Sequence, residues 1–585
     1  MTARSESVKA IVAANAGDES AHAVALGFSR RRRKLALAVV ALAFVMDLLD
    51  TTIVNIAIPS IQGSLHATTS TVEWLIAGYA LAFSLLLITG GRLGDTYGYK
   101  KLFLGGVGAF ALASLFCGLA WSPHALIVAR VVQGMAAAMM VPQVLALMQI
   151  MYPPHERIQV QALFGLMGGT SAALGPLLGA FLIQSNLFGL GWRPIFLINL
   201  PVALLAFLAG NWVLPAGRST HPLKPDLPGA AFLTAILFLI MFPLLEGSSL
   251  SWPWYIFLSM AAALLLVPVF VMYLMWKNAH DGAPLLMPAL FEERAFTVGL
   301  AVSFLFNLGV SGYLLFFTLL VQIGLGYGVL RAGMYSAPFA LGVMFSLGLV
   351  GKRFVPLLGR GMIPIGAALM GASMVTLAVL LPPVPPDQAF SLRIALPQLT
   401  AGIGLGTFLA AMSPIILSNV EVRYSGIAAG VMNSAQQFCG AMGIAVVGGI
   451  FFSLLAHGVG PQIDAALPVL MHAVSTQAGG QTTEALQPGE VESRLRSCSY
   501  LELRLVGGVS STKGQASCTA KDNGTGAAAE IESQIVEQAA IIRTATYRWA
   551  FRWAVVLELG LLFASSLLSF ALPRKLKIYD APGAH

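Results

Sequence analysis

Long apolar runs separated by short polar segments make up most of this chain. An α-helix needs roughly 20 apolar residues to cross a bilayer. We place fourteen such spans at about 35–58, 72–91, 102–121, 125–150, 160–184, 194–214, 228–246, 254–276, 296–321, 332–351, 362–382, 393–418, 426–455 and 549–572. The pattern therefore predicts an all-α, multi-pass membrane protein.

The distribution of Lys and Arg tests this number of spans independently, because short cytoplasmic loops carry an excess of both. If the N-terminus lies inside, the short outer loops contain only Arg193, Arg331 and Arg393. One missed or invented span would reverse the side of every later loop, so the bias supports fourteen spans with both termini inside. The loops predicted to be cytoplasmic contain Arg92, Lys100, Lys101, Arg157, Arg218, Lys224, Lys277, Arg294, Lys352, Arg353, Arg360 and Arg423.

One long polar segment, residues 456–548, interrupts the series and is predicted to lie outside the membrane. Within it, residues 500–506 alternate like a strand, whereas about 528–547 has helical spacing that leads into the last span. Cys498 and Cys518 lie on this outer side, where thiols can oxidise, so we predict a disulfide between them. Cys117 and Cys439 lie in apolar runs and are expected to stay unpaired.

Composition excludes several classes of function. The chain is 57% hydrophobic and 10% charged, whereas a soluble domain carries about 25% charged residues. The basic residues behind the pI near 9.3 flank the apolar runs, which argues against binding of nucleic acid. No cleavable signal peptide is expected, because the first apolar run starts at residue 35 and is too long. We find no nucleotide-phosphate loop, metal-ligand cluster or nucleophile motif, so we predict no enzyme, no metal and no cofactor.

The first span contains a polar stripe. Asp47, Asp50, Thr51 and Asn55 fall on one helical face, since neighbours three and four apart stack. A carboxylate at membrane depth is costly unless it faces protein or water. The stripe therefore predicts a bundle with a hydrated interior and Asp50 in a cavity below the outer surface.

Asp47 and Asp50 lie one helical turn apart, which leaves two interpretations open. Two carboxyls this close and partly desolvated would resist ionising together, so they could hold one proton that an approaching cation would expel. Alternatively, Asp47 is hydrogen-bonded to a neighbouring helix and electrostatically silent.

Residues 49–59, LDTTIVNIAIP, resemble the first-helix signature L-D-x-T-x-x-N-x-A-L-P of the 14-helix drug:proton antiporters in the major facilitator superfamily. Residues 91–101, GRLGDTYGYKK, resemble the superfamily's loop motif after span 2, with Thr96 and Tyr99 where basic residues are usual. In that motif Gly91 and Gly98 would allow close approach and a tight turn. Asp95 would latch the cytoplasmic side, with Lys100 and Lys101 as sources of positive charge.

Three further stretches carry the resemblance. Arg130, Gln133 and Gly134 match the span 4 motif, in which the arginine would tune a nearby acid unless it snorkels to the outer surface. The antiporter motif G-x-x-x-G-P-x-x-G-G of span 5 is matched at Gly175, Pro176 and Gly179, with Ser171 and Ala180 in place of two glycines. The small residues of this motif would let helices pack closely. Residues 192–201 look like the start of span 6 of 14-helix members, and the run 426–449 resembles their thirteenth span.

The resemblance implies the fold and the domains: a cytoplasmic disordered basic tail at 1–34, a six-helix bundle at 35–214 and two inserted helices at 215–295. A second six-helix bundle would comprise 296–455 and 549–572, joined by the extracytoplasmic loop 456–548, and 573–585 would form a cytoplasmic tail. Other charges in or near the spans are Glu558, a second candidate acid, and Glu73 and Glu246, which we expect to be solvated near outer helix ends.

The implied function is secondary active transport: export of amphipathic or lipophilic, cationic compounds in exchange for protons across the cell (inner) membrane. Asp50 would be the coupling acid, so we expect Asp50→Asn to abolish proton-driven efflux while folding is retained. Asp47 would be its partner or a counter-ion for the substrate; if the two acids share a proton, Asp47→Asn should weaken efflux of cations more than efflux of neutral compounds. If the host has two membranes, a periplasmic adaptor and an outer-membrane channel are candidate partners. The alternatives are a proton-coupled importer or a dedicated metabolite exporter on the same fold, and, from another class, a membrane receptor or scaffold that works through its outer loop.

Overall fold

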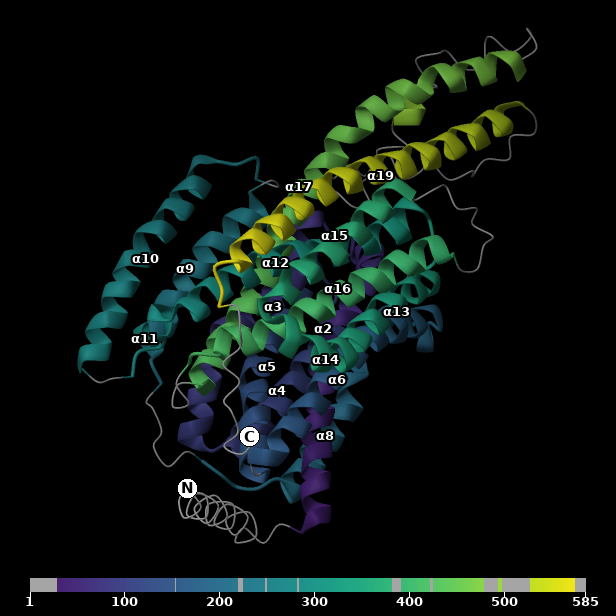
Figure 1. Cartoon of the computed structure of the whole chain (residues 1–585). Coiled ribbons are helices and arrows are strands. Elements are labelled where there is room, and N and C mark those ends of the chain that lie inside the picture. The colour runs from purple at the N-terminus through teal and green to yellow at the C-terminus, as the bar shows by residue number, and fades with distance from the viewer. Residues whose placement is uncertain are drawn as a thin grey trace, which may run out of the picture.

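The computed structural model describes residues 29–152, 154–218, 225–247, 250–280, 283–380, 391–420, 425–477, 493–496 and 527–573. Within these ranges it contains 14 helices long and apolar enough to cross a membrane, which confirms the predicted number of spans (Figure 1).

The first half of the chain forms six spans whose starts are set by local capping. Ser29, Thr68 and Ser122 accept hydrogen bonds from backbone amides in the first turn of the helices that follow them, which stabilises those helix starts. The sixth span is broken into a short helix and a longer one. The elements are α2 (Arg30–Leu65), α3 (Thr69–Tyr97), α4 (Tyr99–Gly118), α5 (Pro123–Met151), α6 (Pro154–Gln184), α7 (Pro194–Leu197) and α8 (Asn199–Val213).

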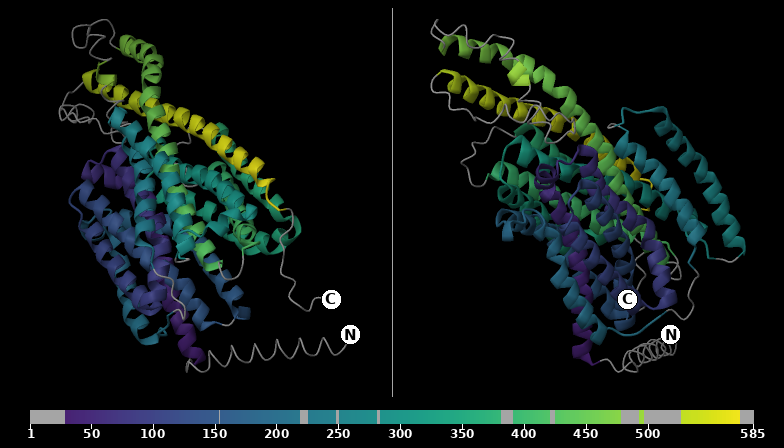
Figure 2. Two further views of the ribbon diagram at one scale, coloured as in Figure 1. Left: turned by 90° about the vertical axis from the view of Figure 1, so that its left-hand side faces the viewer. Right: turned by 180° about the vertical axis from the view of Figure 1, so that it is seen from behind.

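Two further long helices, α9 (Leu227–Glu246) and α10 (Trp254–His280), lie at the edge of the molecule and are followed by the short α11 (Pro288–Glu292). Figures 1 and 2 show them beside the main body rather than within it. α9 packs against α3 and α17 (Ser425–Gln477), whereas α10 packs mainly against α9. Most side chains of α10 are exposed, as expected for a helix that faces lipid.

The second half supplies the remaining six spans. Two of them contain π-helical segments, η2 and η3, in place of a regular α-helical turn. The elements are α12 (Arg294–Leu319), η2 (Leu320–Gly324), α13 (Val329–Phe345), η3 (Ser346–Val350), α14 (Gly351–Leu358), η4 (Gly359–Gly361), α15 (Met362–Leu380), α16 (Leu392–Leu417), α17 and α19 (Ala527–Ser569).

Most helix contacts lie within one half of the chain. α3 packs on α5 and α5 on α4 in the first half, while α16 packs on both α13 and α15 in the second. The halves meet along two seams, α3 with α17 and α6 with α13. One buried apolar cluster is built wholly from the first half, from Ala36 to Leu214, and the largest cluster draws most of its members from the second half.

Helical structure extends beyond two of the predicted boundaries. Residues 30–34, assigned to a disordered tail, are the first turns of α2. The outer segment was expected to begin at 456, but α17 continues to Gln477, and α19 runs unbroken from Ala527 through the last span. The helical interpretation of 528–547 is thus confirmed. Cys498, Cys518 and residues 500–506 lie outside the described residues, so the predicted disulfide and strand stay predictions.

α17 and α19 form a helical arm that projects beyond the other spans (Figures 1 and 2). A small buried cluster, including Val459, Ile463, Ile535 and Ile542, joins the two helices. The buried apolar positions, such as 459 and 463 on α17 and 535 and 542 on α19, recur at helical spacing.

Candidate functional site

Asp50 lies at the centre of a buried polar network in the first half. Its side chain is inaccessible to solvent and forms an ion pair with Arg130, with 2.5 Å between Oδ2 and Nη1. Two amides also donate to Oδ1: Gln133 Nε2 at 2.9 Å and Asn199 Nδ2 at 2.8 Å. Both amides contact the Ser114 hydroxyl as well. The network thus gathers groups from α2, α4, α5 and α8 around one carboxylate.

Arg130 is buried rather than snorkelling to the surface, so that alternative is wrong. Its Nε donates to the carbonyl of Leu75 at 3.2 Å, and its Nη1 also donates to Gln133 Oε1 at 2.7 Å. Gly134 brings α5 against α3, since a methyl group there would lie 2.4 Å from the carbonyl oxygen of Tyr79. The span 4 motif therefore places the cation and the amide that hold Asp50.

Asp47 is linked to the same network through an aromatic ring. The Tyr79 hydroxyl donates to Asp47 Oδ1 at 2.5 Å, and the Arg130 guanidinium lies over the ring, 4.3 Å from its centroid. This favours the interpretation in which Asp47 is hydrogen-bonded to a neighbouring helix. It is not electrically isolated, because a cation over an aromatic face is attracted by the ring.

The polar stripe on α2 is divided between two environments. Asp50 was expected in a hydrated cavity, but it is 1% exposed and points at protein donors. Of the stripe residues, Asn55 instead lines a cavity between the two halves, together with Thr52, which is not part of the stripe; the cavity has a volume of ≈ 60 Å³, enough for several water molecules. Thr51 donates to the backbone oxygen of Leu48 on its own helix. Helical spacing places residues relative to one another, but it does not say which neighbouring helix each one meets.

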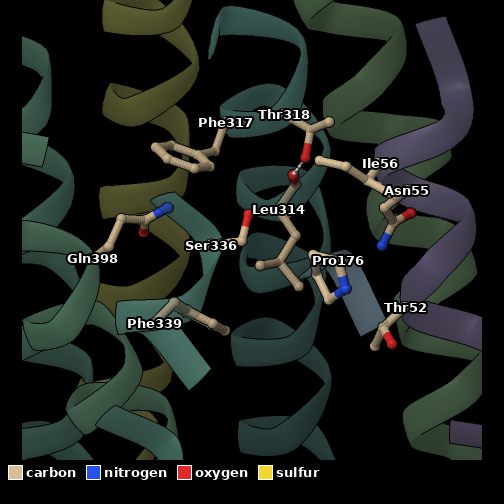
Figure 3. A pocket seen from close by; sticks show the side chains of 10 residues that line it. All are labelled: Thr52, Asn55, Ile56, Pro176, Leu314, Phe317, Thr318, Ser336, Phe339 and Gln398. Atoms are coloured by element: carbon tan, nitrogen blue, oxygen red, sulfur yellow. Dashed lines mark hydrogen bonds between the residues drawn. The ribbon is translucent and has the colours of Figure 1, made fainter. Parts of the chain in front are cut away.

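Side chains from five helices, α2, α6, α12, α13 and α16, line the cavity. Figure 3 shows Asn55 and Gln398 on opposite sides, with Phe317 and Phe339 between them. All the lining residues, which lie in the described part of the chain, are uncharged. They are Thr52, Asn55, Ile56, Pro176, Leu314, Phe317, Thr318, Ser336, Phe339 and Gln398.

The small residues of span 5 hold α6 tightly against α2 next to this cavity. A methyl group on Gly175 would lie 2.0 Å from Thr52 Oγ1, and one on Gly179 would lie 2.6 Å from Ile53 Cγ1. Pro176 lies between them and lines the cavity itself. The motif therefore sets the distance between α2 and α6 at the cavity wall, which is the role that close small-residue packing has in membranes.

The loop motif after span 2 makes its turn at Gly98, whose φ of +99° favours glycine. Gly91 is not tightly packed, whereas a methyl on Gly94 would lie 2.0 Å from Gln143 Oε1. Asp95 accepts a hydrogen bond from Tyr99 at 2.8 Å. Tyr99 thus supplies a partner at a position where the superfamily usually has a basic residue.

The lysines of that motif were expected to supply the positive charge for Asp95. The Lys100 Nζ instead donates to the backbone oxygen of Asn211 at 2.6 Å, and Lys101 is exposed. The sequence places Arg92 in a cytoplasmic loop, but in the structure it is buried on α3. Its guanidinium donates to the carbonyls of residues 283–285, after α10, and so ties the inserted helices to α3.

Glu558 on α19 is fully buried in the second half. Neither carboxyl oxygen has a hydrogen-bond partner among the described residues. Its Oε1 lies near α12, 3.1 Å from where a methyl group on Gly312 would be. Glu558 neither lines the cavity nor contacts the network around Asp50.

The expectation that Glu73 is solvated is wrong, because it is 3% exposed and lies near Gly448 of α17. Glu246 accepts hydrogen bonds from Ser70 and Trp74, which fixes the end of α9 to α3. Both acids occur near helix ends in the sequence, and the position alone did not reveal the neighbouring helix that covers them.

Sequence reasoning missed Tyr79 and Ser114, and it quoted Asn199 without a role. Tyr79 and Ser114 lie in ordinary apolar runs, and nothing local marks them as part of a polar network. Cys117 and Cys439 are free and buried. The described residues contain no group of three or more His, Cys, Asp or Glu side chains that could hold a metal ion.

Comparisons with known proteins agree with this architecture. A family model described as Major Facilitator Superfamily matches residues 40–444. The chain is 35% identical over 456 residues to a "Probable actinorhodin transporter" of Streptomyces coelicolor, which covers 77% of this chain and 78% of that protein. It is 32% identical over 434 residues to a "Tetracenomycin C resistance and export protein" of Streptomyces glaucescens, covering 73% and 77% respectively.

Among solved structures, a bacterial homologue of the human lysosomal transporter Spinster superposes with a TM-score of 0.51 at 18% identity. The match covers 93% of this chain and 98% of that one. At this identity the likeness concerns the fold, and it agrees with the arrangement of helices described above.

Proposed function

The chain belongs to the Major Facilitator Superfamily, and from this premise we propose that it exports amphipathic, drug-like compounds in exchange for protons. Two of its relatives carry export or transport of an antibiotic in their names, which supports export over import. The observation that carries proton coupling is the ion pair of Asp50 and Arg130, buried within the first half.

Protonation of Asp50 would remove the counter-ion of Arg130. A buried cation left without its partner typically costs about 3–5 kcal/mol. The network therefore has to rearrange when a proton arrives, either by admitting water to the guanidinium or by moving α5 relative to α2. Protonation of Asp50 would therefore change the relative positions of these two helices.

Asp47 gives the network a second carboxyl through which charge can be redistributed. Arg130 lies over the Tyr79 ring, and the Tyr79 hydroxyl donates to Asp47. When Asp50 is protonated, Asp47 on the same helix is the nearby carboxyl able to balance part of the charge of Arg130. We therefore propose that the pair shares one proton around a common cation.

The movement reaches the cavity along α2. Asp50 lies within about one and a half turns of Thr52 and Asn55, which form one wall of the cavity. Gly175 couples that wall to α6, and α6 forms one of the two seams with the second half. A rearrangement around Asp50 would thus be transmitted to the site where a substrate binds.

Glu558 has no part in this pathway, so we assign coupling to Asp50 rather than to Glu558. The placement of the protein in the inner membrane, and an adaptor and channel as partners where the host has two membranes, stay predictions.

Transport by the purified protein in liposomes tests the proposal. With an imposed pH gradient, we expect a lipophilic dye to be moved against its own gradient. A proton ionophore should stop this movement, and empty liposomes serve as the control. Movement that persists unchanged with the ionophore, or movement only in the importing direction, would contradict proton-driven export.

A further inference from the structure

The walls of the cavity indicate which compounds it accepts. Charged side chains are absent from the lining residues, all of which lie in the described part of the chain. Asp47 and Asp50 occur on the same helix, but both are buried against α3 and α5, away from the cavity. A cationic compound would therefore lose its hydration without gaining a counter-ion, which is unfavourable in a site of low polarity.

Two side-chain amides face the cavity from opposite halves of the molecule. Asn55 lies on α2, and Gln398 lies on α16 (Figure 3). The Tyr313 hydroxyl donates to Gln398 Oε1 at 2.5 Å, which leaves the amide nitrogen of Gln398 as the donor to a ligand. Among the described residues, Asn55 and this nitrogen have no hydrogen-bond partner. Each amide can donate to a carbonyl oxygen of a bound compound.

The hydroxyl groups of the wall have the complementary role. Thr52, Thr318 and Ser336 each donate their hydrogen to a backbone carbonyl of their own helix, at 3.0, 3.0 and 3.2 Å. Their oxygens can therefore accept a hydrogen bond but have no hydrogen left to donate. Phe317 and Phe339 complete the wall with aromatic surface that suits a flat ring.

From this lining we propose that the transported compound is an uncharged, ring-containing molecule with carbonyl and hydroxyl groups, bound between Asn55 and Gln398, and not an organic cation. The proposal rests on the export function proposed above, and it replaces the cationic substrates expected from the sequence. Because the two amides belong to different halves, one bound molecule would contact both halves.

Binding to the purified full-length protein tests the substrate class, because binding does not depend on leakage of a neutral dye through a membrane. The probes are 1,4-dihydroxyanthraquinone and the same ring system carrying a trimethylammonium-alkyl chain. We expect the neutral dye to bind at least tenfold more tightly. Asn55→Asp should reverse this order, since it places a carboxylate in the wall, and Asn55→Ala should weaken the neutral dye alone.

Asn307→Asp is the matched control. Asn307 lies on α12 outside the cavity and donates to Ser303 of its own helix, so this variant should leave the ratio of the two affinities unchanged. Thermal unfolding of each variant in detergent shows that the fold is retained, and Asn55→Gln provides a second, conservative change that should keep the preference for the neutral dye.

Tighter binding of the cationic dye by the native protein would overturn the substrate class while leaving proton-driven export intact. A folded Asn55→Asp variant with an unchanged ratio of the two dye affinities would do the same. In liposomes, pH-driven movement of the cationic dye alone would have the same meaning. If the protein moves neither dye and binds neither, both the substrate class and the export function are contradicted.

Discussion

Asp50 and Glu558 are two carboxyl groups buried to the same degree in opposite halves of one membrane protein, and their surroundings differ completely. Asp50 has an arginine and two amides as hydrogen-bond donors. Glu558 has no partner among the described residues. Burial alone therefore does not identify a coupling acid. The partners decide whether the charged form is stable and whether gaining a proton changes the neighbouring helices.

The difference has a consequence for how each half responds to a proton. At Asp50 the charge is compensated, so a proton disrupts an existing network that spans four helices. At Glu558 an ion would be uncompensated, which is costly in the interior, so the site suits the neutral acid. We therefore expect Glu558 to keep its proton in this conformation and not to drive the conformational cycle.

The largest expected effect comes from removing the cation of the compensated site. Arg130→Met would leave Asp50 buried without its counter-ion, and we expect the free energy of unfolding to fall by about 3–5 kcal/mol. Arg130→Lys should lose less, because it keeps the charge but not the several donors of the guanidinium. Unfolding in detergent measures both. An Arg130→Met protein as stable as the native one would show that the ion pair is not needed.

A smaller effect on stability is expected at Tyr79, the neutral residue that links Asp47 to the network. Tyr79→Phe removes the hydroxyl that donates to Asp47 and keeps the ring beneath Arg130, so stability should fall by about 1–3 kcal/mol. Asp47→Asn, in which the amide oxygen can still accept that bond, should be less destabilising. Because Asp47 does not line the cavity, Asp47→Asn should change transport of neutral and cationic dyes by the same factor. A selective loss of cation transport would restore the hypothesis of a substrate counter-ion.

The smallest effect is expected at the uncompensated site. Glu558→Met replaces an unpartnered carboxyl with an apolar side chain of similar size, which is close to neutral or stabilising where no hydrogen bond is lost. The number of protons moved per substrate should also stay at the native value. A loss of stability as large as that of Arg130→Met, or a lower proton count, would show that the two acids do not differ as described.

Sequence reasoning reached the number of spans, the motif residues and the two acids of α2, because these signals are local. It could not reach the contacts of Asp50, since Arg130 and Asn199 lie 80 and 149 positions away and their meeting depends on helix packing. The same limit explains why Asp50 was expected to share a cavity with Asn55. The sequence predicts a loop for the outer half of α17 because the glycines, prolines and polar residues from 457 onward interrupt the apolar run.

The buried ion pair changes the expected stability of Asp50→Asn. The sequence suggested that this variant would fold normally, but it would leave Arg130 as an uncompensated buried cation. Asp50→Asn/Arg130→Gln removes both charges at once, and replacing a whole buried pair is often neutral for stability. The pair Asp464 and Arg496 offers a matched control, since it is an ion pair of 2.8 Å between α17 and the described segment 493–496, and both side chains are far more exposed than Asp50 and Arg130.

Proton movement measured together with dye transport in liposomes tests the central claim most directly. For the native protein and for Asp464→Asn/Arg496→Gln, an imposed gradient of the neutral dye should drive protons in the opposite direction beyond the movement in empty liposomes, which measures leakage of the dye. Asp50→Asn/Arg130→Gln should fold and bind the dye with native affinity, yet move no protons with it. If that double variant still exchanges dye for protons at the native ratio, Asp50 is not the coupling acid and the account is wrong.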